Sequence, residues 1–217
     1  MKHGNTFLKA LRPALTTTLV LMLVCGLAYP LLMHGLSGVL FPEQANGSLV
    51  MVDGKAVGSR YVGQEFTADY FMKGRPSAVH YNTYAVDPEG KETYLDGSEF
   101  TGLASGSSNY GPSNPALAQR VEQDLEAFLA KNPEIQREEI PADLMTASGS
   151  GLDPHLSPAA AAIQLPAIAE ASGLSMEILE QIVADNTTGR LLGLFGEETV
   201  NVLGVNVDIA AAMEGAE

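Results

Sequence analysis

The longest hydrophobic run of the chain lies close to its start. Thirty consecutive residues, 13–42, contain no Asp, Glu, Lys or Arg. A helix rises ~1.5 Å per residue, so roughly 20 such residues suffice to cross a hydrocarbon core of ~30 Å. Pro13 fits the first turn of a helix, and Pro30 is expected to kink it or to end its most regular part. The pattern predicts one transmembrane helix over residues 13–36.

The charges on the two sides of this run predict its orientation. Lys2, Lys9 and Arg12 precede it with no acidic residue, whereas all 26 acidic residues and the other nine basic residues follow it. Basic residues are retained on the cytoplasmic side of a span. We therefore expect a short cytoplasmic tail over residues 1–12 and a periplasmic domain over residues 37–217, with a net charge of −17 in the part that follows the run.

Two other interpretations of the apolar run remain. A cleaved signal peptide is compatible with the basic start and with small residues at Gly26 and Ala28. It is disfavoured because the run continues to Leu36, and because Tyr29 and Pro30 would follow the cut. A lipoprotein anchor at Cys25 is disfavoured by the bulky Val24 before it.

Within the outer segment, local patterns predict both strands and helices. Asp53-Gly54 between the apolar runs 48–52 and 55–62 predicts a β-hairpin. Residues 66–94 suggest a loop with one strand, including a turn at 87–90, and residues 141–145 a connection or strand. Alternation over 199–207 predicts a late strand, and residues 210–217 a frayed tail.

Three helix starts are marked by capping residues. Asn114, Ser157 and Ser175 stand where an N-cap is expected, and proline follows the first two. Helical spacing of apolar residues continues from Asn114 to Lys131, and Pro166 is expected to limit or kink the second helix. Together these elements predict an α+β (or α/β) extracytoplasmic domain anchored by one N-terminal transmembrane helix.

Composition excludes several classes of function. A domain of net charge −17 lacks the clustered Lys and Arg that nucleic-acid binding requires. The one cysteine, Cys25, lies in the apolar run, so no disulfide is expected in the domain. The four histidines do not have the spacing of metal ligands. Two loops, residues 105–115 and 146–158, are rich in glycine, and neither has the pattern of a phosphate-binding loop.

One loop carries the residue types of a hydrolase. Residues 146–158, TASGSGLDPHLSP, include Asp153, His155 and the serines 148, 150 and 157. A membrane-anchored hydrolase is therefore an alternative function. A structural role in tight turns is preferred for these residues. Ser, Asp, Pro and Gly are turn formers, and a triad is recognised by geometry rather than by composition.

This loop and residues 105–115, SGSSNYGPSNP, resemble the signature loops of the KdpC family, the C subunit of the bacterial Kdp potassium-transporting P-type ATPase. The resemblance continues through Gly63-Gln64, residues 74–78 (GRPSA), Gly189-Arg190 and residues 200–203 (VNVL), and covers nearly the whole chain. The residues expected to serve structure or subunit contact are Ser105, Gly106, Asn109, Gly111, Pro112, Asn114, Ser148, Gly149, Gly151, Asp153 and His155.

The chain also departs from the family pattern. Ser107 and Tyr110 stand where Gly and Leu are usual, and residues 87–100 look longer than in other members. Ala167 replaces an arginine expected after Gln164, so a nucleotide or subunit contact that relies on this arginine is in doubt.

The resemblance implies a non-catalytic, single-pass subunit of a pump in the bacterial inner membrane. Its implied partners are a channel-like A subunit that selects potassium, a B subunit that hydrolyses ATP and a small F subunit. In this family the C subunit is described as a catalytic chaperone that raises the ATP affinity of the B subunit. We expect no firmly bound cofactor, and ATP contact only in complex with the B subunit. Because the predicted domain is periplasmic and ATP is cytoplasmic, assembly and shaping of the ion entrance are favoured as its mechanism.

Overall fold

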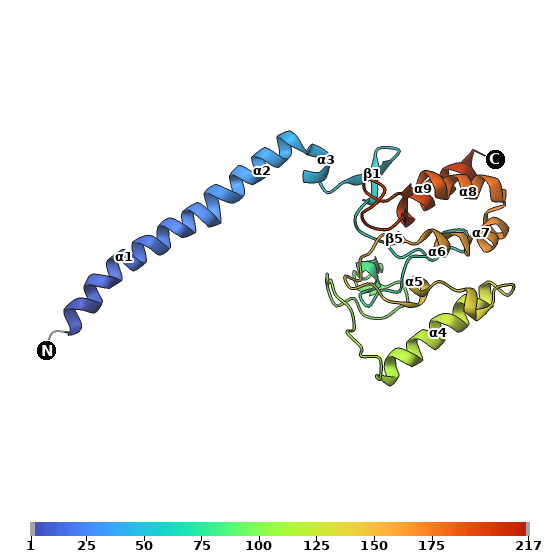
Figure 1. Cartoon of the computed structure of the whole chain (residues 1–217), viewed down its shortest axis with the longest axis horizontal. Coiled ribbons are helices and arrows are strands. Elements are labelled where there is room, and N and C mark those ends of the chain that lie inside the picture. Colours follow the sequence, from blue (N-terminus) through green and yellow to red (C-terminus); the bar gives the residue numbers. More distant parts are fainter. Residues whose placement is uncertain (1–2, 216–217) are drawn as a thin grey trace. The chain divides into compact units, whose positions relative to one another are not determined.

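The computed structural model describes residues 3–215 and separates into two compact units, Met1–Leu49 and Val50–Glu217. The N-terminal unit is dominated by a long helix (Figure 1). It begins as α1, His3–Leu23, passes through a π-helical turn, Val24–Ala28, and continues as α2, Tyr29–Leu40. The short α3, Pro42–Ala45, follows. Pro30 does not end the helix; the π turn directly before it is the irregularity that accompanies the missing proline N–H.

The helix over Lys9–Leu40 is long and apolar enough to cross a membrane, and it lies near the N-terminus. None of its residues is buried. By length and composition this is a candidate membrane span, because an uncovered apolar surface of this size is unfavourable in water.

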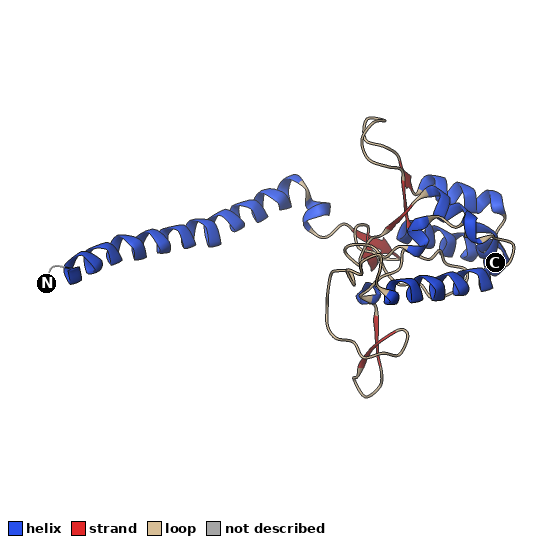
Figure 2. Cartoon of the chain, turned by 60° about the horizontal axis from the view of Figure 1, so that its bottom comes forward, coloured by secondary structure: helices blue, strands red, loops and turns tan. Residues whose placement is uncertain are grey.

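The second unit combines helices with short strands (Figure 2). The strands β1, Leu49–Val52, and β2, Lys55–Ser59, pair around Asp53 and Gly54, whose φ angles are 50° and 75°. The predicted hairpin is thus confirmed. Residues 66–94 contain two strands rather than one, β3, Tyr84–Val86, and β4, Glu92–Tyr94, which pair antiparallel. The predicted turn at 87–90 joins them.

The third sheet brings together three short strands from residues 155–201. Strand β7, Thr199–Asn201, lies between β5, His155–Leu156, and β6, Thr187–Thr188, and pairs antiparallel with both. The described fold is therefore a mixture of helices and small sheets.

The predicted helix starts are correct. Asn114 caps α4, Pro115–Lys131, by accepting a hydrogen bond from the Ala116 N–H. Ser157 caps α6, Pro158–Ala162, and Ser175 caps α8, Met176–Asp185, in the same manner. Pro166 lies in the first turn of α7, Leu165–Ser172. Residues predicted as a connection or strand contain a short helix, α5, Ala142–Met145.

The hydrophobic core lies between the third sheet and the C-terminal helices. Leu156 and Val200 enter it from β5 and β7, and the helices α6 to α9 supply most of the rest. Its largest fully buried side chains are those of Met72, Leu156, Leu179, Ile209, Val200, Val205 and Asn206.

The strand predicted over residues 199–207 is wrong beyond Asn201. There the Asn201 side chain accepts a hydrogen bond from the Gly204 N–H and starts α9, Val202–Glu214. Val202, Val205 and Ile209 are buried at helical spacing, which the alternation of apolar and polar residues concealed. The prediction of a frayed tail over residues 210–217 is also wrong as far as Glu214, because α9 continues to that residue.

Two buried amide side chains hold the irregular segment before β3 against the helices. The Asn206 side chain accepts from the Met72 N–H at 2.8 Å and donates to the Met72 carbonyl at 2.9 Å. Gln164 accepts from the Lys73 N–H at 2.9 Å and donates to the Lys73 carbonyl at 3.2 Å. Both amides are at least 95% buried. They provide the hydrogen bonds that a neighbouring strand would otherwise provide.

Asn206→Ala should lower the free energy of unfolding by about 2–4 kcal/mol, because it leaves the N–H and carbonyl of Met72 unpaired in the core. Denaturant unfolding of the full chain in detergent measures the change. Gln181→Ala is the matched control, because this exposed side chain donates its hydrogen bond to Asp185 of its own helix. Equal losses in the two variants would contradict the role given to Asn206.

Candidate functional site

The two signature loops meet in the structure. The Gly106 N–H donates to the Ser150 carbonyl at 2.7 Å, and the Ser105 hydroxyl donates to the same carbonyl at 3.1 Å. The loops are 45 residues apart along the chain at this contact. Their meeting defines a loop junction, formed by residues 74–82, 104–106 and 146–153.

Residues 74–82 are hydrogen-bonded to several points along the second loop. The Ser148 N–H donates to the Pro76 carbonyl at 3.2 Å, and the Ser77 hydroxyl donates to the Gly151 carbonyl at 2.7 Å. Arg75 donates to Asp153 at 3.2 Å and, through two nitrogens, to the Thr146 carbonyl at 3.2 and 3.3 Å. The guanidinium therefore joins the start of the second loop to its acidic residue.

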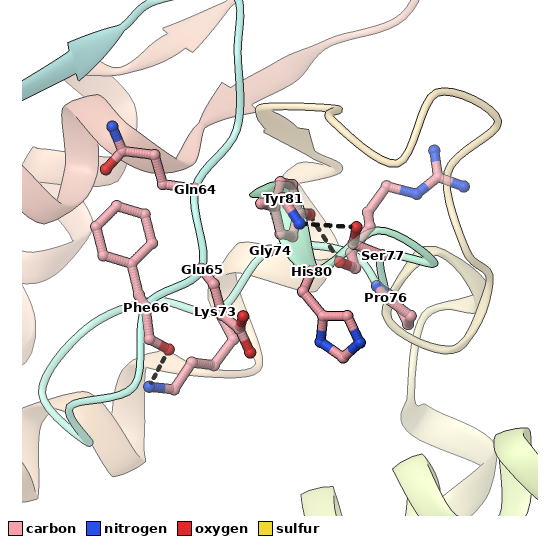
Figure 3. Close-up of a pocket in the computed structure, with 10 residues that line it drawn as sticks. Gln64, Glu65, Phe66, Lys73, Gly74, Pro76, Ser77, His80 and Tyr81 are labelled. Atoms are coloured by element: carbon pink, nitrogen blue, oxygen red, sulfur yellow. Dashed lines mark hydrogen bonds between the residues drawn. The ribbon is translucent and has the colours of Figure 1, made fainter. Parts of the chain in front are cut away.

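A left-handed turn stands at the centre of the junction. His80, Tyr81 and Asn82 have φ angles of 48°, 53° and 53°, a conformation that costs free energy in residues other than glycine. It is retained because Tyr81 is held at both ends. Its hydroxyl donates to the Arg75 carbonyl at 2.7 Å, and its N–H donates to Ser77 Oγ at 3.0 Å (Figure 3).

The surroundings of Tyr81 explain why two motif positions are glycine and why the phenol stays neutral. A Cβ at Gly63 or Gly74 would come within 2.5–2.7 Å of the tyrosine side chain. Burial raises the pKa of Tyr81 to about 12, so the phenol stays neutral and keeps its hydrogen. On the far side of the turn, the Asn82 amide exchanges two hydrogen bonds with the backbone of Ala104.

A small cavity of about 210 Å³ lies beside the turn, lined by Glu65, Lys73 and His80 among others (Figure 3). The Lys73 ammonium donates to the carbonyls of Phe66 and Ala68, at 2.8 and 2.5 Å. Burial lowers the pKa of Lys73 to about 8 and raises the pKa of Glu65. His80 stacks on Tyr94 at a centroid distance of 4.7 Å.

A second, larger cavity of about 610 Å³ lies between α4, α7 and the segment around Lys73. Its wall includes three carboxylates, those of Asp69, Asp124 and Glu170. Of its two lysines, Lys131 pairs with Asp69 at 2.5 Å and Lys73 bonds to backbone carbonyls. Ala167, the position where an arginine was expected, also lines this cavity.

The geometry does not support the alternative of a hydrolase. Ser148 Oγ accepts from the Gly151 N–H and Ser150 Oγ accepts from the Leu152 N–H. Ser157 donates to Asp143, while the nearest ion-pair partner of His155 is Asp153, at 3.8 Å from Nδ1. The serines of the loop thus support turns and a helix cap. The described part of the chain also shows no group of three or more His, Cys, Asp or Glu that could hold a metal ion.

The other predicted site residues lie along the first loop, on its way to α4. The side chain of Asn109 accepts from Ser107 at 3.0 Å, and the Gly111 carbonyl accepts from the Asn114 N–H at 2.9 Å. Gly111, Pro112 and Asn109 are exposed, and Asn114 caps the helix. Gly149 lies in the second loop, with open space where a Cβ would lie. The sequence prediction missed the roles of Arg75 and Tyr81; only the 74–78 motif indicated this segment.

Comparison with known proteins decides the family. The family model described as KdpC, the K+-transporting ATPase c chain, matches residues 11–211. The chain belongs to the KdpC family.

Individual KdpC proteins are similar over nearly their whole length. The potassium-transporting ATPase KdpC subunit of Clostridium kluyveri is 56% identical over 206 residues, which cover 95% of both chains. That of Clostridioides difficile is 52% identical, covering 94% of this chain and 97% of its own, and that of Rhodopseudomonas palustris is 48% identical, covering 94% and 98%. The KdpC resemblance seen in the two loops is thereby confirmed.

Gly151→Ala should disrupt the loop junction and lower the free energy of unfolding by about 2 kcal/mol or more. Its φ is +69°, and a Cβ there would meet Val79 at 2.6 Å and the Gly106 carbonyl at 2.7 Å. Gly149→Ala is the control, since a Cβ at that position meets open space. Denaturant unfolding in detergent measures both variants, and a Gly151→Ala chain as stable as the control would refute this packing.

Stability should rise between pH 8 and pH 10 in the wild type more than in Lys73→Met. The pKa of Lys73 is about 8 in the folded chain and about 10.5 when unfolded, so the unfolded chain binds more protons in this window. The comparison ends at pH 10 because Tyr81, whose folded pKa is raised, acts in the opposite direction above it. Denaturant midpoints at both pH values give the slopes, and parallel slopes would rule out a desolvated Lys73.

Proposed function

We propose that this chain is a non-catalytic, membrane-anchored subunit of a potassium pump that assembles with and stabilises the pump's other subunits. The proposed partners are a channel-like A subunit, an ATP-hydrolysing B subunit and a small F subunit. The observation that carries the proposal is the uncovered apolar helix Lys9–Leu40 in a member of the KdpC family. Lipid and partner helices are the surroundings that such a helix requires.

The loop junction supports an assembly role rather than a reaction. Its polar side chains are engaged in holding backbone: Arg75 on the Thr146 carbonyl, Ser77 on the Gly151 carbonyl and Asn82 on Ala104. Such a network stabilises one loop arrangement, which suits a surface that a partner subunit recognises.

The orientation proposed for the span is N-terminus in the cytoplasm and domain in the periplasm of the inner membrane. The support is the asymmetry of charge, with Lys9 and Arg12 on the N-terminal side and every acidic residue on the other. In this orientation the acidic domain would shape the cation entrance of the pump, because a surface of net negative charge raises the local concentration of cations.

A chaperone role in ATP use would then act through the partner subunits or through the span. The larger cavity gives little support for direct nucleotide binding. Three carboxylates face it, Lys131 is already paired with Asp69, and Ala167 offers no positive charge. ATP contact is therefore proposed only within the complex with the ATP-hydrolysing subunit.

Purification of the tagged full chain from bacterial membranes should recover the larger pump subunits with it. The double variant Leu23→Arg/Leu27→Arg should lose most of this recovery, because each arginine costs about 3 kcal/mol at the centre of a membrane helix. Leu103→Arg, at a position that is 81% exposed in a loop of the domain, should retain it. A wild-type chain that purifies alone would contradict the subunit assignment.

The orientation is testable by cysteine labelling, because Cys25 is the sole cysteine. In a Cys25→Ser background, Ser108→Cys places one exposed thiol in the domain. A membrane-impermeant maleimide should label it once the outer membrane is permeabilised, with the inner membrane intact. Labelling that appears only after the inner membrane is broken would show that the domain faces the cytoplasm.

A further inference from the structure

The end of the β6–β7 hairpin exposes large apolar side chains. Thr188 and Thr199 are the last paired residues of the two strands, and residues 189–198 connect them. Leu191, Leu192, Leu194 and Phe195, here called the apolar tip, are between 63% and 82% exposed. A soluble domain rarely exposes four large apolar side chains together unless they meet a partner or a membrane.

Most N–H groups of the apolar tip are hydrogen-bonded within the hairpin end. The N–H groups of Leu191 and Phe195 bond to each other's carbonyls, at 2.9 and 3.0 Å. Gly193 donates to the Arg190 carbonyl at 3.0 Å, and Leu194 donates to the Leu191 carbonyl at 3.2 Å. Four of the five N–H groups from residue 191 to residue 195 thus bond inside the turn. This property matters in hydrocarbon, where an unpaired backbone group costs several kcal/mol.

The four apolar side chains gather around the end of the hairpin. Leu191 and Phe195 form a bridge pair, whereas Leu192 and Leu194 are the next residues inward on each side. The exposed fractions show that the rest of the domain covers none of these four side chains. A protein groove usually contacts one face of a loop, whereas lipid surrounds an inserted tip.

Charges are confined to the base of the hairpin end. Arg190 precedes the tip and Glu197 and Glu198 follow it, and all three are exposed. A polar base below an apolar end is the arrangement of a segment that enters the headgroup and acyl boundary while its base stays in water.

The connection to the helix limits how far the domain can be from the bilayer. Residues 41–49 span at most about 30 Å even when fully extended, and they lead into β1. The Asn201 side chain in β7 donates to the Arg60 carbonyl, one residue after β2, at 2.8 Å. The sheet that carries the apolar tip is therefore bonded to the part of the domain that the connection enters.

We propose that the apolar tip inserts into the interfacial region of the membrane as a second contact, besides the N-terminal helix. This inference rests on the proposed function, because it requires that the helix spans a bilayer. The tip is thus proposed to contact lipid. The experiment must distinguish this from binding of the tip in a pocket of a partner subunit.

The chain contains no tryptophan, so single tryptophans report on single positions. Three full-length variants are made: Leu194→Trp in the apolar tip, Leu27→Trp in the helix and Leu103→Trp as a control in another loop, where Leu103 is 81% exposed against 77% for Leu194. Each is reconstituted into phosphatidylethanolamine and phosphatidylglycerol vesicles with and without brominated acyl chains. Leu194 is chosen over Leu192 because the φ of Leu192 is positive, at 56°.

Brominated lipid should quench most of the emission of Leu194→Trp and Leu27→Trp, with a blue-shifted maximum for both. The emission of Leu103→Trp should be quenched by aqueous acrylamide and not by the lipid. As a second readout, Leu191→Ser in the Leu194→Trp chain should reduce lipid quenching severalfold, since it removes apolar surface beside the probe.

Three results would overturn the proposal. If Leu27→Trp is quenched by lipid and Leu194→Trp is open to acrylamide, the anchor stands and the second contact is wrong. If Leu194→Trp is shielded from acrylamide only when the other pump subunits are added, and lipid never quenches it, the tip binds a protein. If lipid fails to quench Leu27→Trp, the anchor itself is wrong and the second contact falls with it.

Discussion

Two buried amides hold the segment on which the loop junction depends. Residues 63–79 form no strand, yet Met72 is fully buried and needs partners for its N–H and carbonyl. Asn206 and Gln164 provide them from the helical region, for Met72 and Lys73 respectively. Once these two residues are held, Arg75, Ser77 and Tyr81 follow within a few residues and reach the two signature loops. The amides therefore connect the hydrophobic core to the junction.

The junction is built mainly from backbone contacts, and this explains its composition. Serine hydroxyls and the Arg75 guanidinium bond to carbonyls, and glycines permit approaches that a Cβ would prevent. The left-handed turn around Tyr81 costs free energy that the surrounding hydrogen bonds offset. A site of this kind presents a defined surface, which agrees better with assembly in a multi-subunit pump than with a reaction of its own.

Two of the exposed apolar surfaces lie far apart in the sequence. One is the helix Lys9–Leu40, and the other is the apolar tip at Leu191, Leu192, Leu194 and Phe195. The tip belongs to a strongly acidic domain, and a cluster of four exposed apolar side chains on such a surface requires a specific reason. Lipid contact gives one physical reason for both surfaces, because the helix pairs its backbone internally and the tip bonds four of its five N–H groups within itself.

Features that depend on neighbouring residues could be predicted from the sequence alone. The hairpin at Asp53-Gly54, the caps at Asn114 and Ser157 and the candidate span all follow from local chemistry, and the signature loops were sufficient to indicate the family. Of the candidate site, the sequence indicated the two loops but neither their contact at Gly106 and Ser150 nor the role of Arg75.

Tertiary contacts decided the rest. The segment after Asn201 alternates like a strand but forms α9. In the helix, the Asn206 side chain lies in the core and accepts a hydrogen bond from the N–H of Met72, 134 residues earlier. Tyr81 adopts a left-handed conformation only because Arg75, Ser77 and two glycines surround it. Local sequence determines which turns, caps and apolar runs a chain can form. The hydrogen bonds that burial demands between distant residues determine which alternative it adopts.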